Sequence, residues 1–107
     1  MKTTLEILTQ ARELLSDPAR WTQGVLAQCA DGATTCPNDP DAVCWCFHGA
    51  LYRAAGIAEY RKDSARRAYA LLRQHLGGEL LSTFNDTHTH AQVLAALDHV
   101  IAQERNA

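Results

Sequence analysis

The 107-residue chain has few lysines and no long apolar run, and each shortage argues against a class of partner. Lysine occurs only as Lys2 and Lys62, so arginine carries most of the positive charge. With a net charge of -2, the protein has no overall positive electrostatic field that would attract nucleic acid. No run approaches the roughly 18 apolar residues that a membrane span needs. We therefore expect neither nucleic acid nor a membrane among the partners of the protein.

The first residues, Met1 to Glu6, also lack the apolar core of a secretory signal peptide. A cytoplasmic location is therefore expected, and cysteines in that compartment are usually free thiols. The four cysteines contain no Cys-x-x-Cys pair and are not interpreted as a disulfide framework. One bridge is left open, between Cys29 and Cys36, because these residues flank an Asp31-Gly32 turn.

The residues that are abundant favour helices. Alanine and leucine are the most frequent residues, and β-branched residues rarely alternate with polar ones. Thr3 with Glu6 and Thr89 with Gln92 have the spacing of capping boxes, which predicts helices beginning at both places. A further helix is predicted over residues 64–76, and the link over residues 79–86 is a candidate short turn of helix.

The segment from Asp39 to Leu51 is the most informative part of the chain, because it holds two thiols, an indole and an imidazole. With Asp39 as the N-cap and Pro40 at the first helical position, it is predicted to be a helix that runs to about Ala55 and ends at Gly56. This helix would be apolar on nearly every side. Such a helix is typical of the centre of a bundle.

The first two helices are separated by the irregular stretch 24–39, in which Val25 to Gln28 is a candidate strand and Asp31-Gly32 a candidate hairpin turn. Together the elements predict an all-α fold, with residues 1–107 as a single helical domain. We expect a compact four-helix domain with a buried central second helix, and an irregular loop, with at most a short β-hairpin, between helices 1 and 2.

The same segment raises two chemical alternatives. In a helix, Cys44 and His48 are four residues apart and share a face, so they are the one pair there that could ligate a single metal ion. Cys44 near a helix start could instead serve as the nucleophile of a thiol-dependent hydrolase, because helix N-termini stabilise thiolates. Small thiols commonly fill gaps in a core. We therefore expect no metal, no cofactor and no catalytic residue.

A second group of candidates lies around the polar loop before the last helix. Asn and Asp beside a helix start usually satisfy backbone amides, but this loop also has the composition of a small polar pocket. The two tryptophans are expected to pack in the core, although Trp45 shares its side of the predicted helix with Gly49, where a ligand can approach closely. The candidate binding residues are Trp21, Trp45, Asn85, Asp86, His88 and His90.

Three motifs in these regions resemble DUF6197, a family of small bacterial and phage proteins of unknown function. They are DPARWTQG over residues 17–24, AVCWC with GAL over residues 42–51, and FND with THAQVL over residues 84–94. The resemblance spans most of the chain. Family members typically carry a Gly-Arg pair where this chain has Thr87-His88. The resemblance implies a bacterial, phage or mobile-element source, but no activity and no catalytic residues.

From these observations we expect a non-enzymatic protein-binding or adaptor domain, with a protein partner or self-association at the surface near Trp21, Trp45 and the loop 85–90. Two alternatives are left open. One is the thiol-dependent hydrolase with Cys44 as nucleophile. The other is a small-ligand or metal-binding domain that uses Cys44, His48, Asn85, Asp86 and His90.

Overall fold

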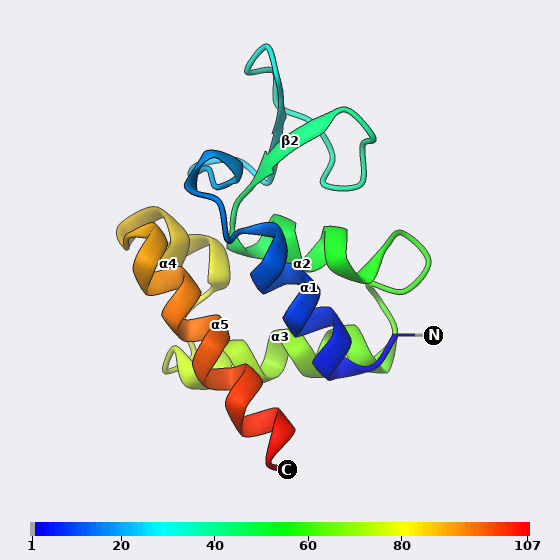
Figure 1. Cartoon of the computed structure of the whole chain (residues 1–107), viewed down its shortest axis with the longest axis vertical. Helices are drawn as coiled ribbons and strands as arrows, with labels where there is room; N and C mark the ends of the chain where they lie inside the picture. The colour runs from blue at the N-terminus through cyan, green and yellow to red at the C-terminus, as the bar shows by residue number, and fades with distance from the viewer. Residues whose placement is uncertain (1) are drawn as a thin grey trace.

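The computed structural model describes residues 2–107, and over this range the chain forms five α-helices, one short 3-10 helix and a two-stranded antiparallel sheet. In chain order the elements are α1 (Thr4–Leu14), η1 (Pro18–Arg20), β1 (Ala27–Cys29), β2 (Ala42–Trp45), α2 (Phe47–Ala55), α3 (Asp63–His75), α4 (Leu81–Thr87) and α5 (His90–Arg105). The strands and their loops lie at one end of the molecule and α3 at the other (Figure 1). The fold is mixed α/β, so the predicted all-α four-helix domain is wrong.

The error lies at the start of the predicted second helix. Residues 42–45 form β2, which pairs with β1 through Ala27 opposite Trp45 and Gln28 opposite Cys44. The helix begins only at Phe47, with Cys46 in an extended conformation as its N-cap. Asp39 caps no helix, because its side chain accepts from the amide of Asp41 and bonds the hydroxyl of Thr35. Local helix signals were therefore overridden by backbone pairing with a distant strand.

The candidate strand and hairpin in the irregular stretch are present in a reduced form. The strand occupies Ala27–Cys29, slightly later than the predicted Val25 to Gln28. The chain turns back at Gly32 and pairs once with the strand, at Gln28 opposite Thr34. The main partner of β1 is β2, so this sheet depends on a contact that is not local in the sequence.

The core is built around α1, which packs against α2, α5 and α3. Its buried stripe contains Ile7, Leu8 and Ala11. The capping boxes predicted for α1 and α5 are confirmed, since in each case the threonine and the Glu or Gln satisfy one another's backbone amides. The link over residues 79–86 becomes α4 rather than a single turn. No helix within residues 2–107 has both the length and the apolar character that would let it cross a membrane.

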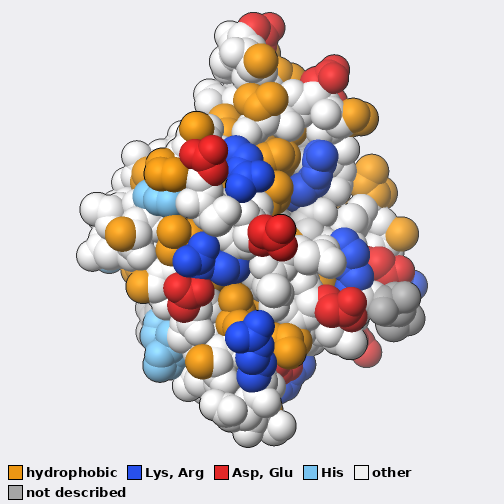
Figure 2. All heavy atoms as spheres, viewed as in Figure 1, with side chains coloured by type: hydrophobic (Ala, Val, Ile, Leu, Met, Phe, Trp, Pro, Cys, Tyr) orange, Lys and Arg blue, Asp and Glu red, His pale blue; other side chains and the backbone are white. Residues whose placement is uncertain are grey.

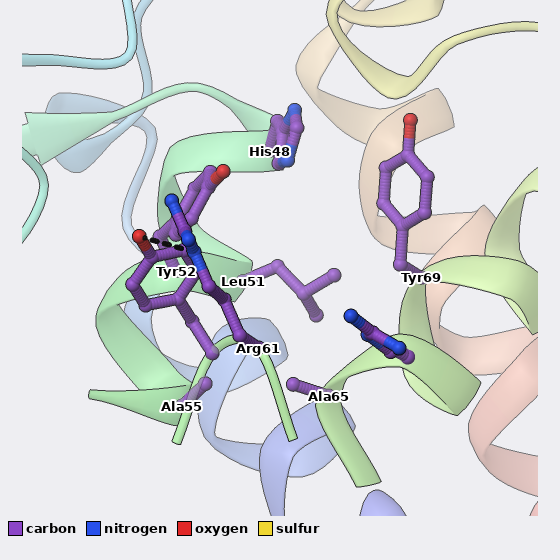
Figure 3. A pocket seen from close by; sticks show the side chains of 9 residues that line it. His48, Leu51, Tyr52, Ala55, Arg61, Ala65 and Tyr69 are labelled. Carbon is purple, nitrogen blue, oxygen red and sulfur yellow. Dashed lines mark hydrogen bonds between the residues drawn. The ribbon is translucent and has the colours of Figure 1, made fainter. Parts of the chain in front are cut away.

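One side of α2 faces the core and the other does not. Phe47, Ala50 and Leu51 are buried, whereas His48, Tyr52 and Arg53 are only partly covered. The helix is therefore not the fully buried central rod that the sequence predicted. Its partly covered side turns toward α3 and forms the wall of a groove (Figure 3).

Candidate functional site

Asn85 is a fully buried amide at the junction of three segments. Its Oδ1 accepts hydrogen bonds from Trp21 Nε1 at 2.6 Å and from the amide of Phe47 at 3.0 Å. Its Nδ2 donates to the carbonyl of Thr22 at 2.9 Å and to Asp86 Oδ1 at 3.3 Å. All four hydrogen-bonding positions of the amide are thus filled from within the protein. The Phe47 amide is among the first of α2, which no backbone carbonyl of that helix could satisfy.

Asp86 and Gln23 strengthen the same junction. Asp86 Oδ1 accepts from the amide of Gly24 at 2.8 Å, and Gln23 Nε2 donates to the carbonyl of Asn85 at 2.9 Å. The two adjacent polar residues of α4 therefore satisfy backbone amides, as the sequence suggested, but these amides lie in the loop after η1 and at the start of α2. In this way the junction joins the three family-like motifs to one another.

The remaining candidates from the sequence lie around this junction. His90 Nε2 lies 2.6 Å from the carbonyl of Leu15, and the ring centroid of His90 is 5.5 Å from that of Trp21. His88 stacks on Phe84 with ring centroids 3.8 Å apart, and its Nδ1 lies 2.9 Å from the Phe84 carbonyl.

Trp45 contacts the junction through its backbone alone. Its carbonyl accepts from the amide of Thr22 at 3.0 Å, whereas its side chain points to the loop between the strands. There Trp45 Nε1 donates to the Pro37 carbonyl at 2.9 Å, and the guanidinium of Arg53 lies 5.2 Å from the centroid of the indole. The structure therefore groups Trp21, Asn85, Asp86 and His90, and places the side chain of Trp45 apart from them.

The thiols have separate surroundings. Cys44 is in β2 with its Sγ 3.6 Å from Gln28 Oε1, whereas Cys46 caps α2 by accepting from the amide of Gly49 at 3.3 Å. Burial raises the pKa of the Cys46 thiol, so this thiol is held in its protonated, less nucleophilic form. Because β2 replaces the predicted helix, Cys44 and His48 no longer share a helical face. Within residues 2–107, no three His, Cys, Asp or Glu side chains are placed to hold a metal ion.

A groove of about 530 Å³ lies between α2 and α3, close to the loop that joins them. Its size falls in the range of small-molecule sites. Figure 3 shows Leu51 pointing from α2 into the space between Tyr52 and Tyr69, with Ala55 and Ala65 below it. The complete lining is His48, Leu51, Tyr52, Ala55, Tyr60, Arg61, Ala65, Arg66 and Tyr69.

The groove contains a continuous row of aromatic rings. Tyr60 contacts Tyr52 with centroids 4.7 Å apart, Tyr52 stacks on His48 at 4.8 Å, and His48 contacts Tyr69 at 5.1 Å. These three tyrosines are all the tyrosines of the chain. None of the four side chains is fully buried. The row therefore presents ring edges and faces to whatever enters the groove.

Arginine side chains flank the row. Arg61 lies 5.3 Å from the centroid of the Tyr60 ring and donates from Nε to the Tyr60 hydroxyl at 3.0 Å. Arg66 is exposed on the same groove. Burial lowers the pKa of His48 below its ordinary value of 6.5, so this ring is neutral at neutral pH. The groove thus combines an apolar floor, neutral aromatic walls and two permanent positive charges.

Sequence reasoning missed this groove and retained only His48 from its lining. A signal was available, because three tyrosines and three exposed arginines fall within residues 52–69. It could not be interpreted without the angle between α2 and α3, since that angle decides whether the rings meet.

A second hollow lies against α3, α4 and α5. Its lining includes three histidines, His75, His88 and His99, and two of these, His75 and His99, are stacked with centroids 4.2 Å apart. Burial and the neighbouring His99 lower the pKa of His75. This hollow shares no lining residue with the groove, although both use side chains of α3.

Comparison with known proteins gives one match. Residues 1–103 match the model of DUF6197, described as a family of unknown function, and this confirms the resemblance drawn from the motifs. No curated protein and no solved structure matches the chain.

Proposed function

The chain belongs to DUF6197, a family of unknown function, and we propose that it is a non-enzymatic binding domain that takes its ligand in the groove between α2 and α3. The observation that supports this proposal is the row formed by His48 and the three tyrosines, all four of which are only partly covered. Two of the tyrosines, Tyr60 and Tyr69, also pack against the core. Aromatic rings that remain partly solvated at the wall of a groove gain apolar contact when a ligand enters.

The polar groups of the groove support binding rather than covalent chemistry. The groove contains hydroxyl, imidazole and guanidinium groups but no cysteine or carboxylate. The thiol at the start of α2, Cys46, is 2% exposed and lies outside this lining. We therefore assign the arginines and tyrosines to recognition, and we place no nucleophile in the groove.

A fragment screen tests the proposal and assumes no particular ligand. ¹⁵N-labelled protein is titrated with a library of small aromatic, apolar and charged compounds, and amide shifts are mapped on the structure. We expect the hits to cluster at residues 48–55 and 60–69, and we expect Tyr69→Leu to lose them while Tyr69→Phe keeps them. Hits confined to the hollow beside His75 and His99, or no hits, would contradict the proposal.

A protein partner, which the sequence favoured, is the second candidate occupant. It is supported by residue type, because tyrosine and arginine contribute a large share of the binding energy in protein interfaces. A pull-down from the source organism would compare the wild-type protein with the double variant Arg61→Glu, Arg66→Glu. A partner that is lost in the double variant and kept by Arg105→Glu supports this candidate, whereas a partner that all three proteins retain contradicts it.

A further inference from the structure

The aromatic row in the groove is suited to a flat, unsaturated ring. The ring planes of Tyr52 and His48 are nearly parallel, with an interplanar angle of 16°. The ring of Tyr69, which contacts His48 from α3, is tilted by 33° from the His48 plane. Leu51 lies between the two walls and is 4% exposed (Figure 3). A planar ring placed over Leu51 would contact an aliphatic floor and aromatic walls, the arrangement by which proteins hold nucleobases without reading their sequence.

The charge of the groove is suited to an anion. Arg61 and Arg66 line it, and within residues 2–107 neither forms an ion pair with a carboxylate. The segment 59–67 has four cationic side chains and two acidic ones, although the chain as a whole has a net charge of -2. A guanidinium is the side chain best shaped to hold a phosphate through paired hydrogen bonds.

We propose that the groove binds a nucleoside phosphate, with the base over Leu51 between the aromatic walls and the phosphate on Arg61 and Arg66. This inference rests on the proposed function and names its ligand class. The volume of about 530 Å³ falls within the range of small-molecule sites and therefore suits a mononucleotide.

Each part of the ligand then has its own contacts. The base binds by stacking, which requires the rings of Tyr52 and Tyr69. No hydrogen bond is required that would distinguish one base from another. The phosphate contributes charge, which requires the two arginines. We therefore expect purine and pyrimidine nucleotides to bind with similar affinity, and we expect removal of either the base or the phosphate to weaken binding.

Calorimetric titration of the full chain tests the proposal with AMP and UMP as probes. Adenosine lacks the phosphate, and inorganic phosphate lacks the base, so the two compounds measure the two parts separately. We expect AMP and UMP to bind at least tenfold more tightly than adenosine or inorganic phosphate. Arg66→Gln should lower the affinity for AMP by about tenfold, which is the loss expected for one charge-assisted hydrogen bond. The control is Arg105→Gln, which changes an exposed arginine of α5 outside the groove and should leave the affinity for AMP unchanged.

Tyr69→Leu keeps the apolar volume and removes the aromatic ring, so it should lower the affinity for AMP. The circular dichroism spectrum of the variant checks that it remains folded. The proposal is overturned if AMP and UMP do not bind, if they bind no better than inorganic phosphate, or if the groove variants bind them as well as the wild-type protein does. It is also overturned if a tetranucleotide or a phosphotyrosine peptide binds more tightly than AMP. Because the fragment screen does not depend on nucleotides, groove hits without nucleotide binding would overturn this inference alone.

Discussion

At the scale of single residues, Asn85 explains why polar groups are found deep in this protein. A buried amide is costly unless each of its donors and acceptors is paired, and Asn85 pairs all of them. Its partners come from the loop after η1, from α2 and from its own helix. One side chain therefore fixes the relative positions of segments that are more than sixty residues apart.

We predict that Asn85→Ala lowers the free energy of unfolding by about 2–4 kcal/mol, because it leaves the Trp21 Nε1 proton and the Phe47 amide without an acceptor. Denaturant unfolding followed by tryptophan fluorescence measures the change. Asn106→Ala, at the exposed C-cap of α5, is the matched control and should change stability by less than about 0.5 kcal/mol. Equal stability of the two variants would remove the central role assigned to Asn85.

The cysteines provide a second test at this scale. Cys36 is exposed, whereas Cys44 and Cys46 are buried, and burial raises the pKa of the Cys46 thiol. We predict that iodoacetamide at neutral pH modifies Cys36 first and reaches Cys44 and Cys46 only after unfolding. Mass spectrometry of peptides at successive times measures the order. Rapid modification of native Cys44 would instead favour the thiol-dependent hydrolase.

At the scale of elements, the junction of β2 with α2 decides the geometry of the groove. The chain leaves the strand at Trp45 and enters the helix at Phe47, with the thiol of Cys46 as the cap. Close packing of the loop before β1 against the first turn of α2 fixes the direction of the helix. This contact depends on Gly49, because a Cβ at that position would lie 2.0 Å from the Leu26 carbonyl oxygen.

We predict that Gly49→Ala destabilises the protein by about 2–3 kcal/mol, although the same change inside an ordinary helix is stabilising. The new methyl group would push the backbone at Leu26 away from α2, and Leu26 accepts the hydrogen bond from the Cys46 amide. Thermal and denaturant unfolding measure the effect. Gln74→Ala, at an exposed position of α3, is the control and should be nearly neutral. A stabilised Gly49→Ala variant would contradict this close contact.

At the scale of the whole molecule, charges of both signs are mixed over the surface. On the face shown in Figure 2, basic and acidic side chains alternate and no area of a single sign dominates. Such a face attracts no polyanion over a long range. Recognition of an anion would therefore be local, which agrees with its assignment to two arginines in one groove.

The stability of the whole molecule should decrease as the pH falls below 6.5. The pKa values of His48 and His75 are lowered in the folded state, so both stay neutral there at a pH at which the unfolded chain already binds protons. Their stabilising contribution is complete above 6.5 and is lost as the pH falls through their folded-state values. Carboxylates with lowered pKa values, such as Glu6 and Glu104, add a further loss at lower pH.

We predict a falling free energy of unfolding between pH 7 and pH 5.5, measured by urea unfolding at each pH. His75→Gln should reduce the slope, because glutamine does not titrate. Arg105→Gln should preserve the slope, because it removes no group that titrates in this range. Constant stability over this interval would show that the two histidines have similar protonation in the folded and unfolded states.

The sequence alone determined the features that depend on neighbours along the chain. The capping boxes at Thr3 and Thr89 follow from a spacing of three residues, and the structure confirms them. The family resemblance was also readable from local motifs, and it is confirmed over residues 1–103. Such signals are local because the helix hydrogen-bonding pattern is local.

Only the tertiary structure decided the features that depend on distant pairing. Residues 42–45 have local signals of a helix but form a strand, because β1 offers hydrogen bonds from thirteen to eighteen positions away. The buried role of Asn85 depends on Trp21, and the groove depends on how α2 and α3 diverge. These contacts are absent from any short window of sequence, since their energy comes from burying side chains and satisfying backbone groups that meet only after the chain has folded.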